Sequence, residues 1–201
     1  MKIPDHKAYS LLKKYNITIP KQVFVEDLKA AREALGKLST PLVLKIDSPE
    51  IIHKSTAGCV QFVYSVGELD AKYKLLLRNA SRKTKKIDGV IVQELIEGPE
   101  YMIGSKNDEQ FGAVICFGLG GIHVEALGDV VFRLIPIKKA DAKQLIDDTR
   151  AKSILKSRSR VLKTLLNASR LVEKEGVSEM DINPLIVNDK AAIAADVRII
   201  K

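Results

Sequence analysis

Apolar positions follow two different spacings along the first half of the chain. Apolar residues at helical spacing predict helices at residues 5–15, 27–38 and 67–83. Short apolar or alternating runs predict strands at residues 22–26, 41–46, 60–64 and 89–96. Asp27 is a candidate N-cap for the second helix, and a polar loop follows the second strand. This half therefore predicts a lobe in which helices and strands alternate.

The pattern changes near Ile96–Pro99, which is the candidate boundary between two lobes. Beyond it the sequence predicts strands at residues 100–106, 111–121 and 130–136, then helices at residues 139–149 and 159–175. The stretches MDINPLIVND and AAIAADVRII predict two closing strands joined by a turn at Asn188–Asp189. We expect one mixed α/β (α+β) domain, with an N-terminal lobe of about residues 1–96 and a C-terminal lobe of about residues 97–201. Lobe boundaries are common places for ligands.

Composition narrows the class of protein. The chain has 201 residues, of which 46% are hydrophobic, which is enough for a packed core. No apolar run reaches membrane-spanning length, and no apolar stretch follows the basic N-terminus, so we expect no secretory signal and a cytoplasmic location. Cys59 and Cys116 form no CxxC pair, which indicates free thiols. Cys116 lies in the apolar run AVICF and is predicted to be buried, whereas Cys59 lies at a polar-to-apolar transition beside Gly58.

The net charge of +8 indicates an anionic partner. Two basic clusters, residues 82–86 and 156–160, raise the possibility of nucleic acid. However, aromatic residues make up only 5% of the chain and do not interleave with these clusters, so no stacking platform is visible. We therefore favour a small anionic ligand over nucleic acid.

Three oxygen-bearing side chains interrupt the apolar stretches at the end of the chain. Asp181 and Asn183 are two residues apart and share one face of a strand, and a hairpin would bring Asp196 near them. Acidic groups in apolar surroundings are costly unless a cation meets them. The set suits Mg²⁺, which takes few protein oxygens and completes its shell with phosphate oxygens. The alternative is local turn chemistry before Pro184.

Lys45 interrupts the apolar strand PLVLKI, and a nucleotide phosphate would neutralise it there. The alternative is an edge strand whose lysine extends along the surface to reach water. The segment FGLGGIHVE, residues 117–125, is rich in glycine, so its backbone amides could approach an anion. The alternative there is a tight turn between strands. Glu125 and Arg133 follow nearby and could face the same cleft.

His53 lies in the polar loop, in the run IIHKSTAGC. An exposed neutral imidazole on a loop is a good nucleophile for phosphorus near neutral pH. The alternative is a solvated histidine without a chemical role. His6, in the first predicted helix, and His123, beside the glycine turn, are weaker candidates.

Three long stretches together resemble one family, the ATP-grasp subunits of ADP-forming acyl-CoA synthetases, which are relatives of succinyl-CoA synthetase. The stretches are PLVLKIDSPEIIHKSTAG, GVIVQELIEGPEYMIGSKNDEQFGAVICFGLGGIHVEALGDVVFRLIP and SEMDINPLIVNDKAAIAADVRII. They cover most of the chain from about residue 41 onward, in the family's order and spacing. The resemblance implies an ATP-grasp fold in which two lobes hold a nucleotide between them.

The resemblance also implies roles for individual residues. His53 would accept a phosphoryl group and pass it to ADP. The residues that would contact ATP or ADP are Lys45, Gly58, the hinge Gln93, Glu94, Leu95 and Ile96, then Glu100 and Arg133. Asp181, Asn183 and Asp196 would hold magnesium. The family's CoA-binding module is missing from this sequence, so the resemblance implies a CoA-binding alpha subunit as partner, with no role for a membrane.

The sequence departs from the family's pattern at three places. Thr56 stands where the family usually has an acidic residue, and Cys59 replaces the second glycine of a Gly-Gly-Val run. Residues 154–160 replace an expected arginine–glycine element. Two alternative functions therefore stay open: another ATP-grasp ligase that joins a carboxylate to an amine, and a diverged nucleotide-binding subunit without turnover.

Overall fold

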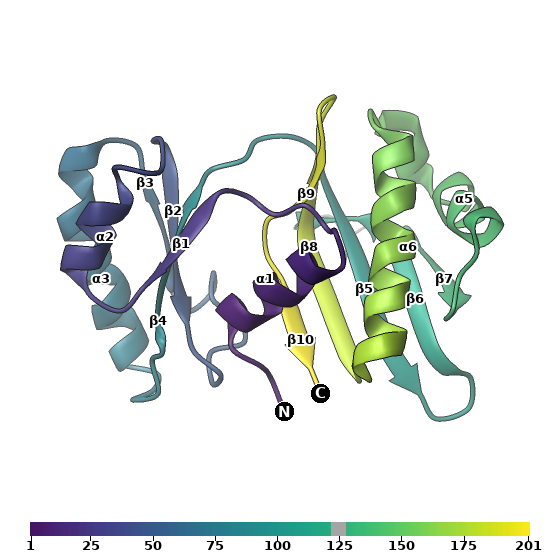
Figure 1. Ribbon diagram of the computed structural model, residues 1–201, viewed down its shortest axis with the longest axis horizontal. Helices are drawn as coiled ribbons and strands as arrows, with labels where there is room; N and C mark the ends of the chain where they lie inside the picture. Colours follow the sequence, from purple (N-terminus) through teal and green to yellow (C-terminus); the bar gives the residue numbers. More distant parts are fainter. Residues whose placement is uncertain (122–127) are drawn as a thin grey trace. The chain divides into compact units, whose positions relative to one another are not determined.

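The computed structural model describes residues 1–121 and 128–201, which form two compact units (Figure 1). One unit consists of Pro4–His6 and Pro20–Leu95, and the other of Met1–Ile3, Lys7–Ile19 and Ile96–Lys201. Within the described part of the chain, no helix is both long and apolar enough to cross a membrane.

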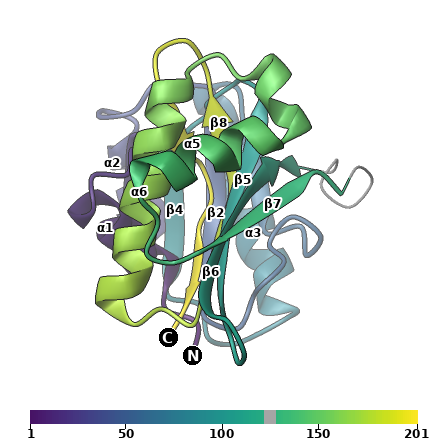
Figure 2. The same ribbon diagram turned by 90° about the vertical axis from the view of Figure 1, so that its right-hand side faces the viewer.

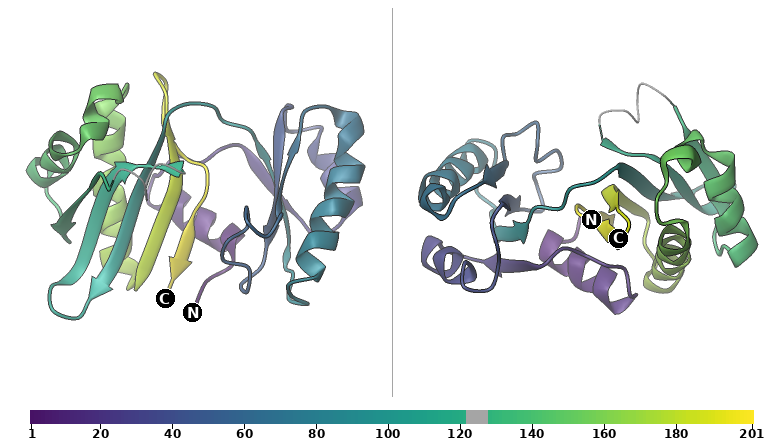
Figure 3. Two further views of the ribbon diagram at one scale, coloured as in Figure 1. Left: turned by 180° about the vertical axis from the view of Figure 1, so that it is seen from behind. Right: turned by 90° about the horizontal axis from the view of Figure 1, so that it is seen from above.

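The first unit is built on a four-stranded antiparallel sheet in the order β1-β4-β2-β3. Its strands are β1 (Gln22–Val25), β2 (Leu42–Asp47), β3 (Val60–Val63) and β4 (Gly89–Glu94). Helices α2 (Leu28–Ala34) and α3 (Leu69–Ser81) lie on one side of the sheet, and the short 3-10 helix η1 (Val66–Glu68) precedes α3 (Figure 3, left). As predicted, Asp27 caps α2, because its carboxylate accepts the N–H of Ala30 at 2.7 Å.

The period-two alternation of side chains sorts the strands of this sheet into two faces. On β2, Leu42, Leu44 and Ile46 pack into the core against the helices. The intervening residues Lys45 and Asp47 therefore lie on the opposite face. The helix-covered face is apolar, so charged groups of β2 gather on the other face.

The second unit contains a six-stranded antiparallel sheet in the order β10-β8-β5-β6-β7, with β9 paired to β8. Its strands are β5 (Glu100–Asp108), β6 (Gly112–Leu119), β7 (Val130–Leu134), β8 (Glu179–Val187), β9 (Ala192–Ala194) and β10 (Arg198–Ile200). Helices α5 (Lys139–Asp148) and α6 (Arg158–Glu175) cover one face, with the short 3-10 helix η3 (Arg150–Ile154) between them (Figure 2). Gly176 ends α6 in the left-handed conformation, with φ of 60°, which glycine adopts without strain.

Helix α1 (Asp5–Lys14) is divided between the two units. The sequence placed residues 1–96 in one lobe, but residues 7–19 group with the second unit. The Tyr9 hydroxyl donates to the Ala195 carbonyl at 2.6 Å, and the Ala194 N–H donates to the Thr18 carbonyl at 2.9 Å. The two termini also lie side by side in this unit, where Lys2 forms a β-bridge with Ile200 (Figure 3). These long-range pairings are absent from any local sequence pattern.

The last predicted strand is divided in the structure, which is a correction to the sequence analysis. Residues 192–194 and 198–200 pair with β8 separately, and the segment between them, residues 195–197, lies outside any strand. Opposite this gap stands Pro184, which has no N–H to donate to a β-ladder. Its carbonyl still accepts the N–H of Ala195 at 3.0 Å. Asp196 therefore lies in an irregular segment rather than on a strand.

Candidate functional site

Lys45 and Gln93 lie on the face of the four-stranded sheet opposite the helices. Lys45 pairs with Ile91 on one side and Val60 on the other, and Val43 pairs with Gln93. The strand is thus interior, so the alternative of an edge strand is wrong. Lys45 is only 7% exposed and Gln93 only 2%. The sheet therefore places a buried ammonium group and a buried amide on the same face, diagonal to each other.

The predicted hinge, residues 93–96, spans the division between the two units, which falls after Leu95. The N–H of Glu94 donates to the Lys21 carbonyl at 3.0 Å, and the N–H of Leu95 donates to the Pro41 carbonyl at 2.9 Å. The Glu94 carboxylate accepts the N–H of Ser39 at 3.1 Å, on the face away from Lys45. These two N–H groups are therefore already used within the protein. A ligand at this segment would have to bind other backbone groups of the hinge.

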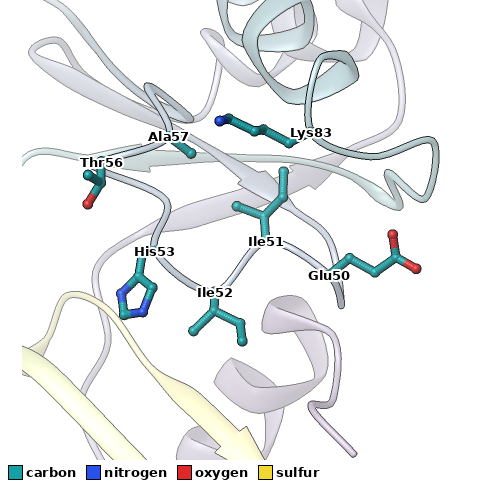
Figure 4. A pocket seen from close by; sticks show the side chains of 7 residues that line it. All are labelled: Glu50, Ile51, Ile52, His53, Thr56, Ala57 and Lys83. Atoms are coloured by element: carbon teal, nitrogen blue, oxygen red, sulfur yellow. The ribbon is translucent and has the colours of Figure 1, made fainter.

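His53 is exposed on the loop that joins β2 to β3. It lines an open cavity of about 280 Å³ together with Glu50, Ile51, Ile52, Thr56, Ala57 and Lys83 (Figure 4). The backbone after His53 forms a turn, because Ala57 donates its N–H to the His53 carbonyl at 3.1 Å and Cys59 donates to Lys54 at 2.8 Å. The loop thus holds the imidazole at the surface on an ordered turn.

Gly58 and Cys59 close this turn. Gly58 has φ of +65°, and a Cβ there would lie 2.9 Å from Asn79 Nδ2. Its carbonyl accepts hydrogen bonds from Asn79 Nδ2 at 2.9 Å and from Gln61 Nε2 at 3.1 Å. Cys59 is fully buried in the core of the unit, and burial raises the pKa of its thiol. The cysteine that departs from the family's pattern therefore fills core volume and is not part of the loop surface.

In the second unit, Asp181 and Asn183 lie on β8, and Asp196, from the irregular segment after β9, is near enough to Asp181 to act on its charge. Burial raises the pKa of Asp181 first, and the negative charges of Asp196 and Glu179 raise it further. The guanidinium of Arg198, paired across the ladder, lowers it in part. The Asn183 Oδ1 accepts the N–H of Gly121 at 3.2 Å. The site is therefore rich in oxygen and carries excess negative charge.

Glu100 stands at the start of β5, where the glycine turn approaches it closely. A Cβ on Gly120 would collide with the Tyr101 backbone, and one on Gly121, whose φ is +66°, would collide with the Glu100 carboxylate. Glycine is required at both positions by this close approach. Since Gly121 also bonds to Asn183, the turn brings Glu100 and Asn183 into one neighbourhood. Glu125 and His123 lie outside the described residues.

Comparison with known proteins identifies the family. A family model described as an ATP-grasp domain matches residues 2–200 of the chain. The chain belongs to the ATP-grasp family. It is 36% identical to the beta subunit of acetate–CoA ligase [ADP-forming] II from Pyrococcus furiosus, and the alignment covers 98% of this chain and 90% of that subunit. It is also 36% identical to acetate–CoA ligase [ADP-forming] II from Archaeoglobus fulgidus, of which it spans 30% of the length.

Solved structures give the same family. The ATP-grasp domain superimposes on the dinucleotide-forming acetyl-coenzyme A synthetase 1 of Candidatus Korarchaeum cryptofilum, solved with coenzyme A and Ca-AMPCP, with a TM-score of 0.93 and 32% identity. The match covers 99% of this chain and 93% of that one. A second structure of that enzyme, with coenzyme A and Mg-AMPPCP, matches with a TM-score of 0.83 and 31% identity over 99% of this chain and 92% of that one. The α/β ATP-grasp fold expected from the sequence is thus confirmed.

The oxygen-rich cluster of this ATP-grasp domain fits the magnesium ion that the family implies. Burial first, and then the charges of Asp196 and Glu179, raise the pKa of Asp181, and a divalent cation would favour its ionised form instead. Among the described residues, no group of three or more His, Cys, Asp or Glu side chains could hold a metal. The protein would thus supply only three ligands, two carboxylates and the Asn183 amide. The remaining coordination positions would be open to phosphate oxygens, as Mg²⁺ prefers.

Arg133 does not lie with this cluster, which is a correction to the sequence analysis. Gly104 pairs with Asp181 and with Cys116, and Cys116 pairs with Phe132, so these residues share one face of the sheet. Arg133 follows Phe132 and lies on the other face. There its guanidinium meets the Asp148 carboxylate of α5 at 2.5 Å. Side chains alternate between the two faces along a strand. The same alternation that places Asp181 on one face of the sheet therefore places Arg133 on the opposite face.

Three residues that sequence patterns did not single out form a buried charged cluster that begins next to His53. Asp5 and Asp47 are fully buried, and Lys54 is 7% exposed. Lys54 Nζ lies 2.7 Å from Asp5 Oδ2, although the two residues are 49 positions apart. The sequence hinted at this cluster only through Asp47, a charged residue directly after an apolar run. No local pattern of residues shows that Asp47 meets the start of α1.

Proposed function

We propose that this ATP-grasp domain is the nucleotide-binding part of an ADP-forming acyl-CoA synthetase, an acid–thiol ligase. The net reaction is acyl-CoA + ADP + phosphate to carboxylate + CoA + ATP, and it is reversible. In this proposal His53 carries the phosphoryl group to ADP. The observation that carries it is the exposed imidazole of His53, held on an ordered turn of an ATP-grasp domain.

The chemical step at His53 is an exchange of one bond to phosphorus for another. A phosphoryl group on the imidazole is attacked by a β-phosphate oxygen of ADP, so the P–O bond of ATP forms as the N–P bond breaks. The imidazole leaves as a neutral group when its other ring nitrogen carries a proton, and it is then ready for the next phosphoryl group. Its exposure suits a group that must receive its phosphoryl from outside this domain.

Nucleotide binding is assigned to the residues that the family resemblance indicates. Lys45 neutralises phosphate charge from an interior strand, and Gln93, with the backbone of Glu94 to Ile96, holds the adenine. Gly58 belongs to the loop that covers the phosphates, and Glu100 faces the nucleotide. Asp181, Asn183 and Asp196 would hold magnesium, which would neutralise charge on the phosphates. Arg133 is left out, because it pairs with Asp148 on the other face of its sheet.

A CoA-binding partner, alpha to this beta, completes the proposed enzyme. The relative from Pyrococcus furiosus is named a beta subunit, and the synthetase from Candidatus Korarchaeum cryptofilum was solved with coenzyme A bound. We assign the acyl-CoA step to that partner or to a further module. A cytoplasmic location goes with this function, and the two buried free cysteines suit a reducing compartment.

The test is phosphate labelling of the reconstituted complex. This chain and its CoA-binding partner are incubated with acetyl-CoA and radiolabelled phosphate, without ADP. We expect an acid-labile, base-stable label on His53 that chases into ATP when Mg-ADP is added. The matched control is His123→Asn, which removes another of the three histidines and should keep the label.

The variants and the wild type separate the competing functions. His53→Asn should lose the label while Mg-ADP still raises its melting temperature. Nucleotide stabilisation with no label on the wild-type complex would overturn the relay and favour another carboxylate ligase or a subunit without turnover. Label that persists in His53→Asn would place the phosphoryl group on a different residue.

A further inference from the structure

A buried ion pair lies directly beside His53. The Lys54 ammonium is 2.7 Å from the Asp5 carboxylate, and the two side chains are only 6% and 1% exposed. Asp5 is the first residue of α1. The side chain of Lys54, which follows the proposed phosphoryl carrier, is therefore buried, while His53 itself is exposed.

Asp47 ties the same point of α1 to strand β2. Its Oδ1 accepts the N–H of Asp5 at 2.8 Å, and its Oδ2 accepts the N–H of His6 at 3.0 Å. The Nδ1 atom of His6 also lies 2.7 Å from Asp47 Oδ2. An acidic group at the first N–H groups of a helix satisfies donors that have no partner within the helix. Since Asp47 is two residues after Lys45, these bonds connect the His53 loop to the strand that carries Lys45.

Stability alone does not account for this arrangement. Replacing a buried ion pair by apolar side chains is often neutral or stabilising, because desolvation of both charges offsets much of their attraction. A buried pair does restrict geometry, since both charges must stay together. Here the restriction falls on the peptide that joins His53 to Lys54.

We infer that Lys54 and Asp5 are positioning residues for His53. Their ion pair fixes the base of the loop, and Asp47 fixes Asp5 with respect to β2. The imidazole then reaches the nucleotide from a defined starting point. This effect on phosphoryl transfer rests on the proposed function, whereas the effect on loop order does not.

Loop order is tested by hydrogen exchange on the full chain. In Lys54→Met the amides of Ala57, Gly58 and Cys59 should exchange at least about tenfold faster, while those of β2 and β4 stay as in the wild type. The matched control is Lys83→Met, which removes an exposed lysine from the same cavity and should leave all these amides unchanged. Unchanged exchange in Lys54→Met would overturn the inference.

A second variant keeps the test decisive if Lys54→Met fails to fold. The double variant Asp5→Leu with Lys54→Met replaces both charges by apolar groups, which buried pairs often tolerate. It should fold and still show fast exchange at residues 57–59. Protection equal to that of the wild type in this folded variant would show that apolar packing suffices and that the ion pair positions nothing.

Kinetics with the partner subunit provide the functional readout. Lys54→Met should bind Mg-ADP within about twofold of the wild type, yet transfer phosphate from His53 roughly 10- to 100-fold more slowly, as expected for a misplaced reacting group. Lys54→Arg keeps the charge and should recover part of the rate. Equal rates in Lys54→Met and the wild type would refute positioning. An unlabelled wild type would instead refute the proposed function, and the exchange data would still decide whether the pair orders the loop.

Discussion

Replacement of Asp181 by asparagine should have opposite effects on the free protein and on the nucleotide complex. Asn keeps the shape of the side chain and removes its charge. Burial and the charges of Asp196 and Glu179 raise the pKa of Asp181 in the folded state, so its ionised form is disfavoured there relative to the unfolded chain. The penalty is present above the raised pKa and vanishes below the unfolded value. At pH 7 it should therefore be relieved in Asp181→Asn.

The expected gain for the free protein is about 0.5–2 kcal/mol, the usual size for removal of an unfavourable interaction. For a chain of this length, 1 kcal/mol corresponds to roughly 2–4 °C in melting temperature. The free Asp181→Asn protein should thus melt a few degrees above the wild type. Most substitutions lower the stability of a protein. An increase in melting temperature would therefore be informative whatever its size.

The nucleotide complex should show the reverse. At a Mg-ADP concentration of about 100 Kd, binding stabilises the wild type by about 2.7 kcal/mol. Loss of one carboxylate ligand that lowers the affinity tenfold removes about 1.4 kcal/mol of that stabilisation. The increase in melting temperature caused by Mg-ADP should therefore be about half as large in Asp181→Asn, and larger losses of affinity reduce it further.

Differential scanning calorimetry with and without Mg-ADP measures both effects, with EDTA added to the metal-free samples. The matched control is Glu179→Gln, which removes an acid two residues away on the same strand, where it pairs with Arg198. This variant should keep the full nucleotide effect. A free Asp181→Asn protein that melts below the wild type would refute the electrostatic reasoning, and an undiminished nucleotide effect would refute the metal assignment.

Three further predictions concern stability and thiol chemistry. The pKa of Glu175 is lowered to about 2, mainly by the hydrogen bond from Lys14, so its stabilising effect is complete above about pH 4.5 and is lost as the pH falls toward 2. Glu175→Gln should therefore lower the melting temperature at pH 7 and flatten its pH dependence between those values, and an unchanged acid profile would contradict this. Gly58→Ala should cost about 1–2 kcal/mol because of its positive φ, whereas Gly67→Ala, with open space around it, should be nearly neutral in urea unfolding. Burial raises the pKa of the Cys116 thiol to about 11, so iodoacetamide at pH 8 should alkylate it in the unfolded protein and barely in the native one, and rapid native labelling would disprove its burial.

The sequence determined the elements and much of their chemistry. Apolar spacing correctly predicted the helices and strands around Lys45, since each of them depends on neighbours within a few residues. The spacing of two between Asp181 and Asn183 indicated a shared face, and burial of Cys116 followed from its apolar run. These features are local, so they can be inferred from the order of residues alone.

Only the tertiary structure decided which distant groups meet. The register of β6 and β7 directed Arg133 to Asp148, and the missing N–H of Pro184 left Asp196 outside the strands. The ion pair between Asp5 and Lys54 joins segments 49 residues apart. Such contacts are set by strand pairing and by the packing of helices on sheets. Those depend on the whole chain at once, so no local pattern of residues can specify them.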